Sequence, residues 1–280
     1  MDRPKLAISF SGGRSSAVMT KLCLEKYGDS HDIVVTFANT GCEHPATLDF
    51  VRDCDLHWGF NTVWLEAVVT HGEKIGSRHK VVTYDTASRN GEPFEQVIKK
   101  YGIPNPSKAG HCTRELKRNV IRSYLRSIGW APKEYVVAIG IRADEIDRLS
   151  TSDPSFIYPL VSLGYSKEMV NAFMRRQPFD LGIPSDAYGN CVWCWKKSLR
   201  KLLTVAKKDP DAFDFPAKME RIYGSQDVAF FRESRSTQDI LAMAQSVKFE
   251  PYADSSQLTI WDELLDLGGA CSDGCEVGHD

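Results

Sequence analysis

The chain has 280 residues, of which 42% are hydrophobic and 26% are charged, and its formal net charge is -2. This length and apolar content suffice to bury a core, so the composition argues against a disordered chain. No apolar stretch approaches the roughly 20 residues of a membrane span, and the charged N-terminus lacks a signal-peptide core. We therefore expect a cytoplasmic protein that has no membrane partner.

Short apolar runs alternate with helical periodicity in the first half of the chain. Strands that are buried on both faces are predicted at 6–10, 32–37, 61–65 and 135–139. Helices are predicted at 17–27, 45–58, 93–101 and 113–128. This order predicts an α/β fold, a Rossmann-like doubly wound parallel sheet whose ligands bind beyond the carboxyl ends of the strands.

The second half of the chain loses the strand pattern after about Asp153. Helices are predicted there at 166–175, 196–208, 215–223 and 237–245. We therefore expect three units along the chain. They are a nucleotide-binding α/β domain over 1–153, a mainly helical region over 154–248 that carries a Cys-x-x-Cys pair, and an acidic, cysteine-containing tail over 249–280.

The charges are unevenly spread. Residues 108–126 carry six cations and one acid, residues 196–208 carry six cations and no acid, and residues 249–280 carry eight acids and no Lys or Arg. Each basic segment is either a surface for a polyanion, such as a nucleotide or a nucleic acid, or a solvated helix face. The acidic end would be repelled by the same polyanion.

The first predicted strand runs into the sequence SGGRSS, directly before the first predicted helix. Gly12 and Gly13 allow several backbone N–H groups to point into one concavity at a helix N-terminus, which is a phosphate-binding arrangement. Further hydroxyl donors come from Ser11, Ser15 and Ser16. The spacing is not that of a Walker A loop, which has four residues between its glycines and a Lys followed by Ser or Thr.

This loop resembles the modified P-loop (PP-loop) of the adenine nucleotide alpha hydrolase superfamily, whose usual form is Ser-Gly-Gly-x-Asp-Ser. Arg14 stands where Lys is common, and Ser15 stands where the Asp is expected. Further stretches resemble the phosphoadenosine phosphosulfate (PAPS) reductase branch in order and spacing: FANTGCEHPATLDFV, HCTRELK, GIRADEIDR, and YPLVSLGYSKEMVNAFM with LGIP. The resemblance spans about residues 5–203 and implies a HUP-type Rossmann-like fold that binds ATP or a related adenine nucleotide.

The resemblance also implies a site. Its implied nucleotide contacts are Ser9, Ser11, Gly12, Gly13, Arg14, Ser15, Ser16, Asn39, Thr40, Gly41, Glu43, Arg114, Lys117 and Gly140. The implied catalytic residues are Arg142, Glu145 and Arg148. The guanidinium groups of the two arginines contact phosphate or sulfate, and Glu145 orients one of these arginines or holds magnesium. Two other interpretations stay open. In one, Glu145 and Arg148 belong only to a surface ion-pair network. In the other, Glu43 only places a favourable negative charge at the N-terminus of its helix.

Cys191 and Cys194 form a Cys-x-x-Cys pair, a spacing at which two thiolates bind one metal or cluster. The resemblance adds Cys112 as the third ligand of a 4Fe-4S cluster, and we assign Cys271 as the fourth. Alternatives for the fourth position are His111, Cys275 and an open iron site. Zinc at the same positions is the alternative to the cluster.

Cys275 has a second interpretation as a catalytic nucleophile. PAPS reductases carry a nucleophilic Cys on a C-terminal Glu-Cys-Gly-x-His segment, which attacks sulfur and is resolved by a thiol donor. This chain ends in GCEVGHD, with related residue types in another order. Acidic neighbours disfavour a thiolate there, so a redox-inert tail is the alternative. Cys23 and Cys54 are predicted to be packing residues.

These patterns are consistent with three functions. The leading one is a PP-loop enzyme that cleaves ATP at its alpha-phosphate, adenylates an acceptor and releases pyrophosphate, in sulfur-transfer chemistry with an iron-sulfur cluster. One alternative is a sulfonucleotide (PAPS or APS) reductase that uses Cys275. The other is a non-catalytic protein that binds a nucleotide or a nucleic acid. The expected partners are a nucleic-acid acceptor, tRNA or DNA, and a sulfur or thiol donor protein.

Overall fold

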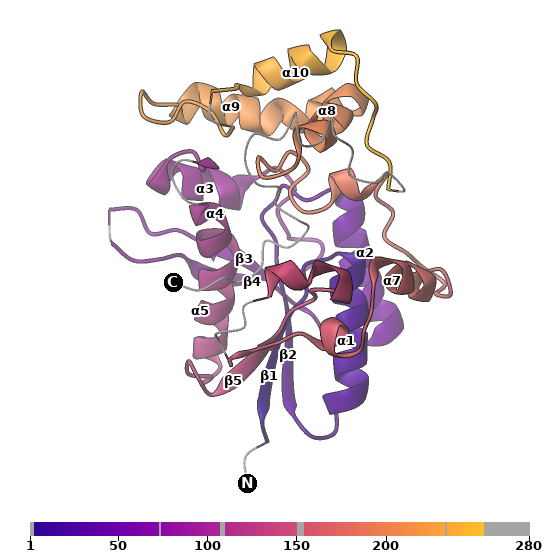
Figure 1. Ribbon diagram of the computed structural model, residues 1–280. Helices are drawn as coiled ribbons and strands as arrows, with labels where there is room; N and C mark the ends of the chain where they lie inside the picture. The colour runs from indigo at the N-terminus through magenta and orange to yellow at the C-terminus, as the bar shows by residue number, and fades with distance from the viewer. Residues whose placement is uncertain (1–2, 73, 107–109, 150–153, 233, 255–280) are drawn as a thin grey trace.

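A six-stranded sheet forms the centre of the molecule in a computed structural model, which describes residues 3–72, 74–106, 110–149, 154–232 and 234–254 (Figure 1). Its strands are β1 (Lys5–Ser9), β2 (Asp32–Ala38), β3 (Val63–Val68), β4 (Arg78–Val82), β5 (Tyr135–Ala138) and β6 (Phe156–Ile157). They lie in the order β4-β3-β2-β1-β5-β6, and all neighbours are parallel except the antiparallel pair β3 and β4. The predicted α/β doubly wound sheet is confirmed.

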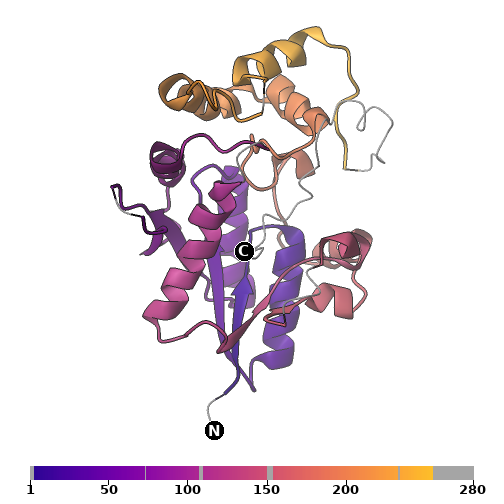
Figure 2. The ribbon, with the colours of Figure 1, turned by 60° about the vertical axis from the view of Figure 1, so that its left-hand side comes forward.

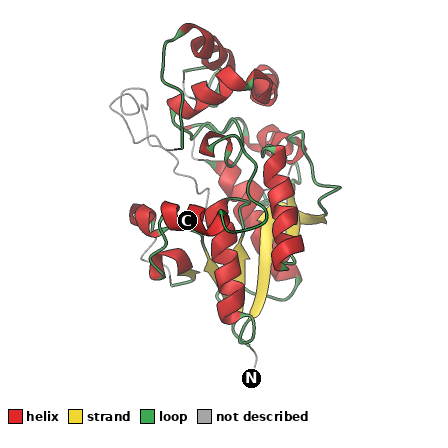
Figure 3. Cartoon of the chain, turned by 90° about the vertical axis from the view of Figure 1, so that its right-hand side faces the viewer, coloured by secondary structure: helices red, strands yellow, loops and turns green. Residues whose placement is uncertain are grey.

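Different helices cover the two faces of this sheet (Figure 3). Leu6 and Ile8 of β1 pack in one cluster with residues of α1 (Arg14–Tyr27) and α2 (Pro45–Trp58). Ala7 points the other way and joins a second cluster with residues of α3 (Glu92–Tyr101) and α5 (Asn119–Ser127). Because successive side chains of a strand point to opposite faces, β1 supplies the floor of both layers.

Local signals set the ends of α2. The ring nitrogen Nδ1 of His44 accepts a hydrogen bond from the backbone N–H of Ala46 at 3.2 Å, and Pro45 occupies the first helical position. Gly59 ends the helix with a φ of 66° in the left-handed region that favours glycine. These bounds are the predicted ones.

Several elements differ from the prediction. β4 and β6 were not predicted, because β4 carries three basic side chains in five residues and β6 has only two residues. The single helix expected at 113–128 is instead α4 (His111–Thr113), a π-helical turn η2 (Arg114–Arg118) and α5. Residues 196–198 are not helical, because the Ser198 side chain caps a helix that begins at Leu199.

The chain after β5 forms short turns and helices. They are η3 (Ala143–Arg148), α6 (Pro159–Ser162), α7 (Lys167–Met174), η4 (Asp186–Tyr188), α8 (Leu199–Lys208), η5 (Pro210–Phe213), α9 (Asp214–Tyr223) and α10 (Thr237–Ser246). Helices α6 and α7 pack on α1, whereas α8, α9 and α10 lie together beyond the carboxyl ends of the strands (Figures 1 and 2). Within the described ranges, no helix has the length and apolarity needed to cross a bilayer.

Candidate functional site

The loop between β1 and α1 is built on two glycines that have different conformations. Gly12 has a φ of 79°, and a Cβ atom there would lie 2.7 Å from Cγ2 of Thr47. Gly13 is extended and precedes the first residue of α1, with no side chain capping the helix. The first backbone N–H groups of α1 therefore face the hollow in front of the loop, where an anion would bind.

Serine hydroxyls hold this loop in shape. The Ser16 hydroxyl lies 3.0 Å from that of Ser11, accepts a hydrogen bond from the Ser11 backbone N–H at 3.2 Å, and donates to the Gly13 carbonyl at 2.9 Å. Ser15, which stands at the Asp position of the PP-loop, accepts a hydrogen bond from Nη1 of Arg142 at 3.0 Å. The loop is thereby joined to the segment that follows β5.

A cavity opens in front of residues 11–16, and we call it the phosphate-loop cavity. Arg142, Glu145 and Arg148 line it from η3 and its N-terminal flank, and Lys167 lines it from the start of α7. The segment after β5 can approach the loop because Gly140 has no side chain: a Cβ there would lie 3.0 Å from Cα of Ser16. The carboxyl ends of β1 and β5 thus meet at this cavity, as the doubly wound fold predicts.

Glu145 organises the arginines of the cavity. Its side chain is largely buried, and Oε1 accepts from Nη1 of Arg148 and lies 3.3 Å from Nη2 of Arg142. Its Oε2 accepts from the Arg142 backbone N–H at 3.2 Å. One carboxylate therefore pairs with two guanidinium groups in the wall of the cavity, and the role of Glu145 toward a nucleotide stays a prediction.

Arg14 lines the cavity, but its guanidinium group is paired with the segment that follows α7. Its Nε and Nη2 atoms donate to both carboxylate oxygens of Asp180, at 2.7 and 3.1 Å, and Nη2 also donates to the Leu181 carbonyl at 2.9 Å. This bidentate pair fixes the segment after α7 against α1. Sequence reasoning missed Asp180, and it missed Lys167 and Asp186, which form an ion pair on the wall of the cavity.

The residues after β2 form a braced turn beside the cavity, not part of its wall. The Asn39 amide donates to Oε1 of the buried Glu66 at 2.7 Å, and its own oxygen accepts from the Gly41 N–H at 3.2 Å. Gly41 has a φ of 77°. The Glu43 carboxylate accepts from both the hydroxyl and the backbone N–H of Thr40, at 2.8 and 3.1 Å. As placed, these side chains shape the turn itself.

Three other predicted contacts lie apart from the phosphate loop. Nε of Arg114 donates to the buried Glu115 at 2.8 Å. Lys117 lines a second, smaller cavity. Ser9 lines a groove between β1 and α5, on the face of the sheet away from α1 and α2. The structure therefore brings Arg142 and Arg148 to the loop but leaves Arg114 and Lys117 outside the wall of its cavity.

The second cavity gathers the predicted cysteine ligands, and we call it the cysteine cavity. Cys112, Cys191 and Cys194 all line it, with Cys191 buried and the other two partly exposed. Asn190 lines this cavity and the phosphate-loop cavity, so the two adjoin. Within the described residues, no three His, Cys, Asp or Glu side chains are placed to hold a metal ion as they stand. Cys271 and Cys275 lie outside the described residues.

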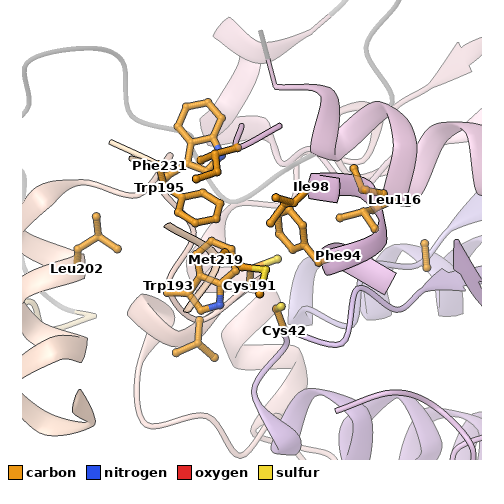
Figure 4. Packing of buried hydrophobic residues seen from close by; sticks show 14 of the residues in the cluster. Cys42, Phe94, Ile98, Leu116, Cys191, Trp193, Trp195, Leu202, Met219 and Phe231 are labelled. Atoms are coloured by element: carbon orange, nitrogen blue, oxygen red, sulfur yellow. The ribbon is translucent and has the colours of Figure 1, made fainter. Parts of the chain in front are cut away.

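Cys42 was missed as a neighbour of these cysteines. Its carbonyl accepts from the Val192 N–H at 3.0 Å, and Figure 4 shows its side chain beside those of Cys191 and Trp193. Burial, followed by the nearby Cys191 and Glu43, raises the pKa of the Cys42 thiol well above its usual value. The sequence feature that indicates this position is that Cys42 directly follows the Asn-Thr-Gly turn.

His111, an alternative for the fourth ligand, is also buried, and its Nε2 donates to the Gly102 carbonyl at 3.0 Å.

A mostly parallel sheet with a glycine loop at a helix N-terminus and converging arginines is typical of an α/β protein of the nucleotide-binding PP-loop class. Residues 5–150 match the family described as "Phosphoadenosine phosphosulfate reductase domain". The chain therefore belongs to this family, within the PP-loop adenine nucleotide alpha hydrolase superfamily.

Two curated relatives show the extent of the similarity. The chain is 31% identical to the "Uncharacterized nin region protein ORF290" of Escherichia phage lambda over 281 residues, which cover 96% of this chain and 94% of the relative. It is 32% identical over 97 residues to the "Uncharacterized protein MJ0066" of Methanocaldococcus jannaschii, covering 35% of this chain and 15% of that protein. The similarity to the phage relative covers nearly the whole chain, so it includes the sequence of the helical region as well as that of the sheet.

Proposed function

We propose that the protein binds ATP in the phosphate-loop cavity and cleaves it at the alpha-phosphate in sulfur-transfer chemistry. In this reaction an acceptor oxygen attacks the alpha-phosphorus, and the bond from that phosphorus to the bridging oxygen of the beta-phosphate breaks. Pyrophosphate leaves with the electron pair, and the acceptor becomes adenylated. One observation carries the proposal: the glycine loop at the N-terminus of α1 shares a cavity with Arg142, Arg148 and Lys167.

Each part of the cavity has a role in this proposal. The backbone N–H groups of residues 12–16 and the positive end of α1 bind the departing pyrophosphate. Arg142 and Arg148 neutralise the charge that develops on the bridging oxygen, and Glu145 holds both guanidinium groups in place before the substrate arrives. Magnesium bound with the nucleotide would neutralise further phosphate charge.

The test is titration calorimetry with ATP and with PAPS, followed by a pyrophosphate-release assay over tRNA, DNA and small-molecule acceptors. We expect ATP to bind and pyrophosphate to appear in step with acceptor modification. Preferential PAPS binding, with sulfite release that Cys275→Ser abolishes, would instead identify a sulfonucleotide reductase. Binding without turnover over all acceptors would leave the non-catalytic interpretation.

We further propose that Cys112, Cys191 and Cys194 supply three ligands of a 4Fe-4S cluster. Their shared cavity and their thiolate chemistry support it, since thiolates are the usual ligands of such clusters. The side chains would have to draw closer together on binding, because they do not form a metal site as they stand. The cluster, when bound, would offer a site for binding or transferring sulfur, and Cys42 joins Cys271, Cys275 and His111 as a candidate fourth ligand.

Serine substitutions test the cluster. Protein purified without oxygen should be brown and contain about four iron atoms per chain if a 4Fe-4S cluster forms. Cys112→Ser should lose most of this iron and the visible absorption. Cys23→Ser is the matched control, because Cys23 lies in the core beside Met19, where burial raises the pKa of its thiol to about 12. A colourless protein that contains one zinc would contradict the proposal.

A further inference from the structure

A groove of about 830 Å³ runs along the face of the sheet that α1 and α2 do not cover. Its floor is made of small and apolar side chains from the strands, Ala7 and Ser9 of β1, Thr36 of β2 and Val137 of β5. One wall is α5, which presents Ile121 and Leu125 to the groove. The groove is therefore an apolar trough along the middle of the sheet.

The described residues leave this half of the sheet without a covering helix. The backbone of α5 packs against β2, β3 and β4, and the later helices α6 and α7 pack against α1 on the other face. Figure 2 shows α5 along the sheet from this side. Tyr135, Val136 and Val137 of β5 are only partly buried, although β5 pairs with a strand on each side. Parallel strands are normally covered on both faces, so the groove requires an apolar cover.

The rim of the groove is positively charged. Arg122 and Arg126 of α5 line it, and the buried Arg118 at the end of η2 precedes them by the same four-residue interval, which places the three along one side of the continuous helix. Lys133 lines its far end. Among the described lining residues the one acid is Glu134, and it is paired with Lys5 at 3.0 Å. An occupant that fits must therefore be apolar on one side and acidic on the other.

We propose that the chain's own segment 257–267, QLTIWDELLDL, occupies this groove. Six of its side chains are apolar: Leu258, Ile260, Trp261, Leu264, Leu265 and Leu267. Three are acidic: Asp262, Glu263 and Asp266. The apolar side chains cover the strands, and the carboxylates face the arginines of α5. The segment thus supplies both of the properties that the groove requires.

The end of the described chain places this segment within reach. Asp254 accepts a hydrogen bond from the Asp186 backbone N–H at 2.8 Å, at the edge of the phosphate-loop cavity. Ser9, which lines the groove, is two residues from the start of the phosphate loop, so one end of the groove lies at the same edge of the sheet. A tethered segment has an effective concentration in the millimolar range, so modest contacts suffice.

Amide exchange and hydroxyl-radical footprinting on the full chain test this proposal. We expect slow amide exchange in 257–267 and slow oxidation of Tyr135, which lines the groove. The double variant Asp262→Lys/Glu263→Lys should speed both by about tenfold, since two ion pairs become repulsive. Arg122→Glu/Arg126→Glu should have the same effect, and combining the two double variants should restore slow exchange and oxidation.

The control is Lys99→Glu, which reverses an exposed charge on α3 outside the groove and should change neither rate. Unchanged thermal melting of each variant shows that the fold is retained. Rapid exchange of 257–267 in the unmodified protein would overturn the proposal, and so would variants in which both rates stay as they were. Protection that is lost on dilution would overturn it as well, because the occupant would then be a second copy of the chain.

Discussion

Arg142→Ala is expected to lower the rate constant of pyrophosphate release by about 100-fold or more, with a smaller change in KM. The Arg142 guanidinium donates to Ser15 of the phosphate loop at 3.0 Å and lies on the wall of the cavity. In the reaction that we propose, this guanidinium contacts the oxygen on which negative charge grows as the bond to the alpha-phosphorus breaks. Because this charge is larger in the transition state than in bound ATP, the loss falls on kcat.

Two comparisons separate this role from a structural one. Arg175→Ala removes an exposed arginine at the end of α7, away from the cavity lining, and should leave kcat unchanged. Arg142→Lys should recover only part of the activity, because an ammonium cannot reproduce the forked contact to Ser15 and Glu145. An Arg142→Ala variant with normal kcat and normal melting would contradict the role given to Arg142.

Gly12→Ala and Gly13→Ala should have very different costs, although the two glycines are adjacent. At Gly12 the new Cβ lies 2.7 Å from Cγ2 of Thr47, and the φ of 79° is unfavourable for alanine. Backbone strain and overpacking together should lower the free energy of unfolding by about 2–4 kcal/mol. At Gly13 the nearest atom would be the Ser11 hydroxyl at 3.8 Å and the backbone is extended, so the change should be within about 0.5 kcal/mol.

Urea unfolding of both variants measures these costs, and ATP titration measures the effect on binding. Gly12→Ala should weaken ATP binding because the loop cannot keep its shape. Gly13→Ala should weaken ATP binding only through the methyl group in the cavity, with stability preserved. Equal destabilisation by the two substitutions would show that the positive φ of Gly12 does not restrict which residue this position accepts.

The parts of the fold that local chemistry determines were predictable from the sequence. Helix α2 was predicted with its observed bounds, and in the structure Pro45 opens the helix and Gly59 ends it. The buried parallel strands β1, β2, β3 and β5 were found from their apolar runs. β4 was missed because its side chains, RHKVV, are mostly polar, and an edge strand has no need of an apolar pattern.

The site was less predictable, because its contacts join distant parts of the chain. Arg142 and Ser15 are 127 residues apart, and Arg14 and Asp180 are 166 residues apart. Motif resemblance indicated the arginines and the loop, but it could not show that Asp180 engages Arg14. Nor could periodicity place Cys42 beside Cys191, since that contact depends on the way the turn after β2 meets the Cys-x-x-Cys turn.

The two edges of the sheet also bear on how the protein behaves at high concentration. β4 carries the exposed Arg78 and Lys80 at one edge, and two molecules that met there would bring these cations together, whereas His79 packs inward against Ser123 and Tyr124 of α5. β6, at the other edge, has two residues and can form few intermolecular backbone hydrogen bonds. Because edge-to-edge pairing is a common first step of aggregation, this sheet resists growth into a larger intermolecular sheet at both ends.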